Sequence, residues 1–138
     1  MMMATWDVIA ERFLHVTDKL GKKIDDGIFD TVVALNMLGV GTLQSCEGHI
    51  EWGVPYPWVS IQNDLEQKFL LHQYLARFYK DRSADFDCVL IFHGYRMHSR
   101  GAAFSDLFSE AERQQKLKAY QAEMSDFTTF LKAILDRS

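Results

Sequence analysis

Apolar residues recur along the first part of the chain with the period of a helix. Between residues 6 and 20 they lie three or four positions apart: Trp6, Ile9, Phe13, Val16 and Leu20. This spacing is typical of one buried face of a helix. We expect the helix to start after Thr5, whose hydroxyl can cap it, and to end at Gly21.

Three more helices are predicted farther along the chain, with limits set by capping residues and glycines. Their expected limits are Asp25 or Asp26 to Gly39, about Asp64 to Lys80, and Ser109 onward for the longest. The positions expected to face the core recur with the same helical period. They are Ile28, Val32, Leu35, Leu71, Leu75, Phe78, Leu117, Tyr120, Met124, Phe127, Leu131 and Ile134.

Four short segments have the composition of strands. They are residues 42–46, Trp58–Ile61, Phe86–Phe92 and 95–104. The run from Phe86 to Phe92 is almost continuously apolar, which is typical of a strand buried on both faces. Residues 47–57 form the loop between the first two strands, because their glycines and two prolines break regular structure.

The elements follow one another in the order ααββαββα, which predicts an α+β protein. We expect a single domain over residues 1–138, with a small mixed β-sheet of three to four strands and about four helices. A helix between strands 58–61 and 86–92 predicts a right-handed crossover between parallel strands. The short link to strand 95–104 predicts that the last two strands are antiparallel.

Composition and charge exclude several classes of protein. Hydrophobic residues make up 48% of the chain, so a core can form without a disulfide or a structural metal. The net charge of −4 argues against a nucleic-acid partner, because duplex-binding modules usually carry a basic field. No apolar run is long enough to span a bilayer, and the N-terminus lacks the features of a signal peptide. We therefore expect a cytoplasmic protein without membrane contact, in which Cys46 and Cys88 stay reduced.

The stretch Gln44–Ile50, QSCEGHI, gathers the residues with the most useful chemistry. Cys46 is expected at the end of a strand, and Gly48 allows the sharp turn that follows. A thiolate is a good nucleophile or soft metal ligand, and His49 lies close enough to act as its base or to lower its pKa. Glu47 can orient the imidazole or act as a general acid or base. The catalytic candidates are therefore Cys46, Glu47 and His49.

The same residues also fit a purely structural role. A cysteine at a strand end is commonly a small buried hydrophobe, and a glycine after a strand commonly makes a turn. The aromatic residues of the following loop favour a site, because such loops often line ligand pockets. We expect the pocket to include Ser45, Trp52 and Trp58 as ligand-binding residues. Cys46 and His49 supply only two of the three or four ligands that zinc needs, so the spacing predicts no metal site.

A second polar segment, residues 93–100, reads HGYRMHSR. Arg96, His98 and Arg100 alternate, so on a strand they share one face. That face is either an anion subsite, because arginine offers a planar fork of donors, or the solvated face of an edge strand. If the strands pair as expected, Arg100 lies nearest to the Cys46 turn. Arg100 is therefore the candidate contact for a small-molecule or anionic ligand.

Residues 22–50 carry a longer pattern. They read K-K-I-D-D-G-I, then L-N-M-L-G, then T-L-Q-S-C-E-G-H-I. This pattern resembles a group of small bacterial proteins of unassigned activity that carry S-C-E-G-H after a short helix. That resemblance implies no activity for the chain.

The same segment more faintly resembles the N-terminal segment of the tRNA wybutosine-synthesizing methyltransferases, whose motif reads S-S-C-S-G-R-I. The matching positions are Ser45, Cys46, Gly48 and Ile50 in the motif and Asp26, Ile28 and Asn36 in the preceding helix. Glu47 and His49 depart from the motif, and the missing arginine weakens a contact with RNA phosphate. The resemblance implies S-adenosylmethionine-dependent methyl transfer to tRNA.

Two main hypotheses for function follow from the sequence. The first is a ligand-binding or catalytic pocket around the turn Cys46–His49, for a substrate that the residues do not name. The alternative is an interaction module without chemistry, in which the aromatic loop 52–58 or the C-terminal helix binds a partner or a second copy of the chain as a homodimer. Methyl transfer to tRNA is a lesser alternative. The residues themselves name no cofactor.

Overall fold

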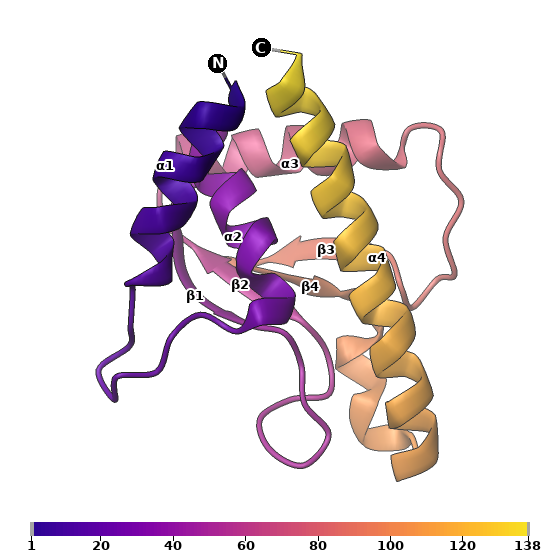
Figure 1. Ribbon diagram of the computed structural model, residues 1–138. Helices are drawn as coiled ribbons and strands as arrows, with labels where there is room; N and C mark the ends of the chain where they lie inside the picture. Colours follow the sequence, from indigo (N-terminus) through magenta and orange to yellow (C-terminus); the bar gives the residue numbers. More distant parts are fainter. Residues whose placement is uncertain (1, 138) are drawn as a thin grey trace.

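The computed structural model describes residues 2–137 and has the α+β class and the element order that the sequence predicts (Figure 1). The elements are α1 (Met2–Leu14), α2 (Asp26–Met37), β1 (Thr42–Cys46), β2 (Trp58–Ile61), α3 (Leu65–Tyr79), β3 (Leu90–His93), β4 (Arg96–Ser99), η1 (Arg100–Leu107) and α4 (Glu110–Asp136). The four strands form one sheet. The 3-10 helix η1 was not predicted, and it occupies the second half of the segment expected as the last strand.

The sheet has the strand order β1-β2-β4-β3, and every neighbouring pair is antiparallel. The sheet is therefore not mixed, because the β3–β4 hairpin folds back and places β4 between β2 and β3. β2 and β3 run parallel, as predicted, but they are not neighbours. The hairpin turn consists of Gly94 and Tyr95, and Gly94 has the positive φ (69°) that favours such tight turns.

β3 lies at the edge of the sheet, so the prediction that residues 86–92 form a strand buried on both faces is wrong. Only Leu90–His93 is extended, and the residues before it form a turn in which the Cys88 N–H donates to the Asp85 carbonyl. Phe86 is 67% exposed. Apolar character alone does not separate a central strand from a turn that leads into an edge strand.

The core lies between one face of the sheet and the helices α2, α3 and α4 (Figure 1). Val59 and Met97, which pair across β2 and β4, are fully buried there, as are Phe127 and Leu131 of α4. Every position that the helical period placed inward in these three helices is buried or half-buried. Removal of this apolar surface from water, at about 25 cal/mol per Å², is the main stabilising contribution to the fold.

α1 covers Met2–Leu14, so the predicted limits at Thr5 and Gly21 are both wrong. The last members of the predicted stripe, Val16 and Leu20, lie beyond the helix and are 44% and 93% exposed. The apolar spacing therefore continued past the point at which the backbone leaves the helix.

Residues 15–25 form a loop and do not continue α1, because the Asp18 side chain accepts hydrogen bonds from the backbone of this segment. The Asp18 carboxylate accepts the N–H groups of Leu20 and Lys22. Such side-chain acceptors offer the backbone an alternative to helical hydrogen bonds. The loop that results passes beside β1 and becomes one wall of the site described below.

An ion pair ties α4 to the loop before β3. Lys116 of α4 donates to the Asp87 carboxylate, and the Tyr120 hydroxyl donates to the same oxygen. The Lys116 ammonium holds the pKa of the Asp87 carboxyl below its ordinary value, although partial burial acts in the opposite direction. The folded state is therefore favoured where Asp87 is ionised.

We predict that Asp87→Asn lowers the free energy of unfolding by up to about 1 kcal/mol at neutral pH, the usual range for a partly exposed ion pair. Because the folded-state pKa lies below the unfolded value of about 3.9, this contribution is present above about pH 4 and is lost as the pH falls through the folded-state pKa. Urea unfolding at neutral pH and in acid measures the difference. Asp106→Asn, at an exposed carboxylate of η1, is the control and should change little. A deficit in D87N that persists undiminished in acid would contradict the assignment.

Candidate functional site

The turn after β1 is held against the first residues of α2 by two hydrogen bonds that run in opposite directions. The Glu47 backbone N–H donates to Asp25 Oδ2 at 3.0 Å, and Glu47 Oε1 accepts the backbone N–H of Gly27 at 2.9 Å. Asp25 is the N-cap residue of α2, but its side chain makes no capping bond. Glu47 supplies a cap from outside the helix, which leaves the Asp25 carboxylate available to the site.

Two glycines allow this close approach. A Cβ on Gly27 would lie 2.9 Å from Glu47 Oε1. Gly48 has a φ of +93°, and a Cβ there would lie 2.6 Å from Leu117 Cδ1 and 2.8 Å from the Tyr56 carbonyl carbon. The prediction that Gly48 makes a turn with positive φ is confirmed. Packing against α4 is a second reason for glycine at this position.

Cys46 ends β1 with its side chain almost out of contact with solvent. Its exposed fraction is 8%, and Sγ accepts a hydrogen bond from the Gly48 N–H at 3.4 Å. Burial raises the pKa of the thiol, the Gly48 N–H opposes this shift, and the nearby Asp25 carboxylate adds to it. At neutral pH Cys46 is therefore a neutral thiol, whereas a nucleophile requires the thiolate.

The His49 imidazole is held between a carboxylate and an indole ring. Its Nε2 lies 3.3 Å from Asp25 Oδ2, and its ring stacks on Trp52 with centroids 3.8 Å apart. The His49 backbone N–H donates to the Val54 carbonyl, which fixes the residue at its other end. The carboxylate that contacts His49 is that of Asp25 and not that of Glu47, the residue predicted to orient the imidazole.

Asp25, which the sequence pattern indicates only as a helix cap, connects these groups. Its carboxylate binds the Glu47 N–H and His49, and its Oδ1 lies 3.2 Å from Lys22 Nζ. Partial burial would raise the pKa of this carboxyl, but the hydrogen bonds outweigh burial and lower the pKa. One signal was present in the sequence: two consecutive aspartates, Asp25 and Asp26, precede a helix that needs one cap.

Asp25, Cys46 and His49 bring three potential metal-ligating atoms together. A carboxylate oxygen, the Sγ atom and a ring nitrogen all lie within 4.8 Å of one another. The side chains of Asp25 and His49 are 10% and 19% exposed, so the group is shielded from solvent but not sealed. Within residues 2–137, no other group of three such side chains is close enough to hold an ion.

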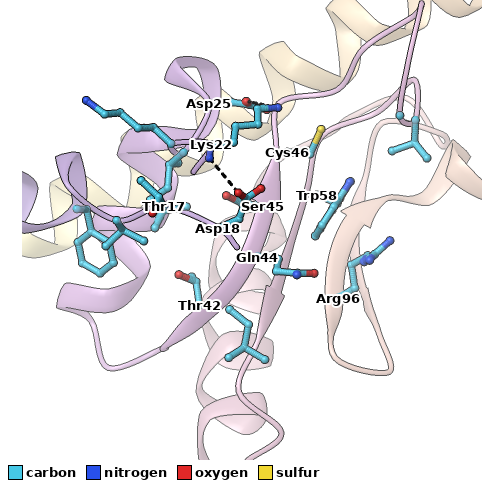
Figure 2. A pocket seen from close by; sticks show the side chains of 18 of the residues that line it. Thr17, Asp18, Lys22, Asp25, Thr42, Gln44, Ser45, Cys46, Trp58 and Arg96 are labelled. Atoms are coloured by element: carbon cyan, nitrogen blue, oxygen red, sulfur yellow. Dashed lines mark hydrogen bonds and ion pairs between the residues drawn. The ribbon is translucent and has the colours of Figure 1, made fainter. Parts of the chain in front are cut away.

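A cleft of about 430 Å³ opens beside this group (Figure 2). It lies between segment 16–25, β1 and residues 52–54. Figure 2 shows Asp25 and Cys46 at one end of the cleft. Its volume falls within the range of small-molecule sites, about 300–1,000 Å³.

Three of the four ligand-binding residues predicted from the sequence line this cleft: Ser45, Trp52 and Trp58. The fourth, Arg100, does not. Its backbone N–H donates to the Val89 carbonyl, and its guanidinium lies over the Phe86 ring at 4.3 Å from the centroid. Arg100, the first residue of η1, therefore lies near the segment that leads into β3 and away from β1.

Arg96 takes the place that was predicted for Arg100. It lies in β4 opposite Ser60 of β2, and its guanidinium is 3.9 Å from the centroid of the Trp58 ring. Arg96 and His98 share one face of β4, as predicted, but β4 is an inner strand and not an edge strand. Among residues 2–137, no carboxylate pairs with the Arg96 guanidinium.

Comparisons of the chain with protein-family models, with curated proteins and with solved structures found no match. The resemblances to bacterial proteins and to methyltransferases therefore stay predictions from the sequence. Among residues 2–137, no helix is both long enough and apolar enough to cross a membrane. The assignment of a function rests on the geometry of the site.

We predict that Gly48→Ala destabilises the fold by roughly 2–5 kcal/mol. A left-handed backbone costs an alanine about 1–2 kcal/mol, and pressing a methyl group against Leu117 and the Tyr56 backbone adds about 1–3 kcal/mol. Gly53→Ala is the matched control, because Gly53 also has a positive φ (73°) but open space around its Cβ position. Urea unfolding measures both losses, and equal losses would contradict the packing argument.

A second prediction concerns the cap that Glu47 provides. Glu47→Ala is expected to lower the free energy of unfolding by about 1 kcal/mol, because the Gly27 N–H loses its acceptor. Glu47→Gln keeps an acceptor oxygen and should retain most of the stability. Chemical unfolding of the three proteins measures the effect. Equal losses in the two variants would mean that the charge of Glu47, and not its acceptor oxygen, stabilises the turn.

Proposed function

We propose that the protein binds a small anionic molecule in the cleft, with the Cys46–His49 turn and Asp25 forming the reactive end of the site. The observation that carries this proposal is the position of Asp25 and Cys46 at one end of a cleft of about 430 Å³, close to His49. A cavity of this size with a few convergent polar groups is the usual form of a small-molecule site.

The charge of the cleft supports an anionic ligand. Three cationic side chains line it: Lys22, Lys23 and Arg96. Two carboxylates, Asp18 and Asp25, lie among them, and both already accept hydrogen bonds from backbone N–H groups. Lys22 pairs with Asp25, whereas Arg96 has no such partner among the described residues. Its guanidinium offers the planar fork of donors that carboxylate and phosphate groups match.

The two tryptophans of the cleft hold two of these three cations in place. The Arg96 guanidinium stacks on Trp58, and Lys22 Nζ lies 4.1 Å from the centroid of the Trp52 ring. Side chains that are held before the ligand arrives lose less conformational entropy on binding. The aromatic loop therefore serves the pocket by fixing its charged groups.

The roles of the candidate residues change accordingly. Cys46 is a neutral buried thiol, so we do not assign it the role of an activated nucleophile. Glu47 is occupied in capping α2, so we assign it a structural role in place of acid–base chemistry. Asp25 replaces it as the carboxylate that orients His49.

The fold gives less support to the alternative hypotheses for function. The apolar stripe of α4 belongs to the core, so an interaction module based on that helix loses its binding surface. Trp58 of the aromatic loop lines the cleft. A cytoplasmic location is consistent with the free state of both cysteines. Homodimer formation and methyl transfer to tRNA stay predictions.

Tryptophan fluorescence tests the proposed ligand site. The probes are inorganic phosphate, pyrophosphate and citrate, and at least one of them is expected to change the emission in a saturable manner. Trp58→Phe should reduce this change, because Trp58 lines the cleft. Trp6→Phe is the control, since Trp6 packs against the core and does not line the cleft. The absence of a saturable change in the folded wild-type protein would contradict the proposal.

A pair of arginine variants locates the anion contact. Arg96→Gln is expected to weaken binding at least about tenfold, because a hydrogen bond to a charged group contributes about 1.5–3 kcal/mol. Arg100→Gln is the matched control, because Arg100 stacks on Phe86 away from the cleft. Binding that is unchanged in R96Q, or weakened equally in both variants, would contradict the proposed site.

A further inference from the structure

We infer that Asp25, Cys46 and His49 form a binding site for a divalent transition-metal ion of the zinc type. The inference deepens the proposed function and rests on it, because the ion would lie at the reactive end of the same cleft. A carboxylate oxygen, a thiolate sulfur and an imidazole nitrogen are the donor types that zinc accepts in proteins. Sequence spacing supplied only two of these donors, and the fold adds the third.

The distances fit a single ion with little movement. Bond lengths of about 2.0–2.3 Å and tetrahedral angles place the donor atoms around one zinc ion about 3–4 Å apart. His49 Nε2 and Asp25 Oδ2 are already 3.3 Å apart, and the three ligand atoms lie within 4.8 Å of one another. The widest separation therefore exceeds that of a zinc site by only about 1 Å.

Neighbouring groups hold each of the three side chains in place. The Glu47 N–H fixes Asp25 Oδ2, the Trp52 ring fixes the plane of the His49 imidazole, and the Gly48 N–H donates to the Cys46 sulfur. Partners of this kind orient ligands and tune the ion in metal sites. The turn therefore contains both potential ligands and the groups that position them.

The donor set selects the class of ion. Thiolate and imidazole ligands suit zinc and its neighbours among the transition metals, whereas magnesium and calcium take oxygen ligands. The Cys46 thiol releases its proton to the solvent as the metal–sulfur bond forms. We therefore expect Zn²⁺ and Co²⁺ to bind and Mg²⁺ not to compete.

The position of the metal site beside the cleft determines what a bound ion could do chemically. Three protein ligands with one open position are the arrangement of catalytic zinc sites, whereas structural sites are closed by four protein ligands. Asp25 and Cys46 line the cleft and His49 does not, so an ion held by the three would be reached from the cleft past Asp25 and Cys46. The open position is left for water or for an oxygen of the ligand, and Arg96 lines the same cleft to bind another part of the anion.

Cobalt substitution tests the metal site without any anionic ligand. The full chain, treated with a chelator, is titrated with Co²⁺, and the thiolate-to-cobalt charge-transfer absorption in the near ultraviolet is recorded. We expect one Co²⁺ ion to bind per chain, Zn²⁺ to displace it and excess Mg²⁺ to have no effect. Circular dichroism confirms that each protein used is folded.

The two cysteines form a matched pair for this experiment. Both are free and both are 8% exposed, but only Cys46 belongs to the group. Cys46→Ser is expected to abolish the charge-transfer band, and Cys88→Ser to retain it. Asp25→Asn keeps an acceptor for the Glu47 N–H and so preserves the turn. This variant should weaken Co²⁺ binding at least about tenfold, since loss of even an outer partner costs about 10–100-fold.

The outcomes separate the metal site from the anion site. A folded wild-type protein without the band, a band that survives Cys46→Ser, or a folded Cys88→Ser protein without it overturns the metal inference. Phosphate titration of the same chelator-treated protein, without and with Co²⁺, then decides the other question. If the protein binds no Co²⁺ but binds an anion in a manner that depends on Arg96, the proposed anion site is supported and the metal inference is overturned. Co²⁺ binding without any anion binding supports the metal and overturns the proposed ligand.

Discussion

The exchange of hydrogen bonds between the turn after β1 and the start of α2 is the constraint on which the site depends. Glu47 caps the helix with its side chain, and the Asp25 carboxylate accepts the backbone N–H of Glu47. A shift of β1 by one residue would move Glu47 away from Asp25 and Gly27 and break both bonds. The exchange therefore fixes β1 against α2, and with it the positions of Cys46 and His49.

The helices could be predicted because their pattern is local, whereas the sheet order could not. Burial of a stripe that recurs every three or four residues needs only a neighbouring surface. α1 is the exception, because the Asp18 side chain competes with the helix for backbone N–H groups in a way that apolar spacing does not reveal. The apolar run 86–92 fits a central strand and an edge strand equally well. The short link that contains Gly94 indicated that β3 and β4 are antiparallel neighbours, but not which of them pairs with β2.

Site residues that are close together in the sequence could be predicted to be neighbours, whereas residues that only the fold brings together could not. Ser45, Cys46 and His49 lie in one short stretch, so any turn brings them near one another. Asp25 comes from a different element, and its type and position also suited a simple helix cap. The choice between Arg96 and Arg100 depends on where β4 ends and η1 begins, which follows from the pairing of β4 with both β2 and β3.

The location of the site at the N-terminus of α2 has an electrostatic consequence. The aligned peptide dipoles of a helix place roughly half a positive elementary charge at its N-terminus. In this protein that end meets two carboxylates, those of Asp25 and Glu47, with the Cys46 sulfur close by. Negative groups gathered in so small a volume repel one another, and the field of α2 offsets part of that repulsion where water provides little screening. The helix thus acts as a built-in counter-charge for these two carboxylates, in addition to the Lys22 ammonium that pairs with Asp25.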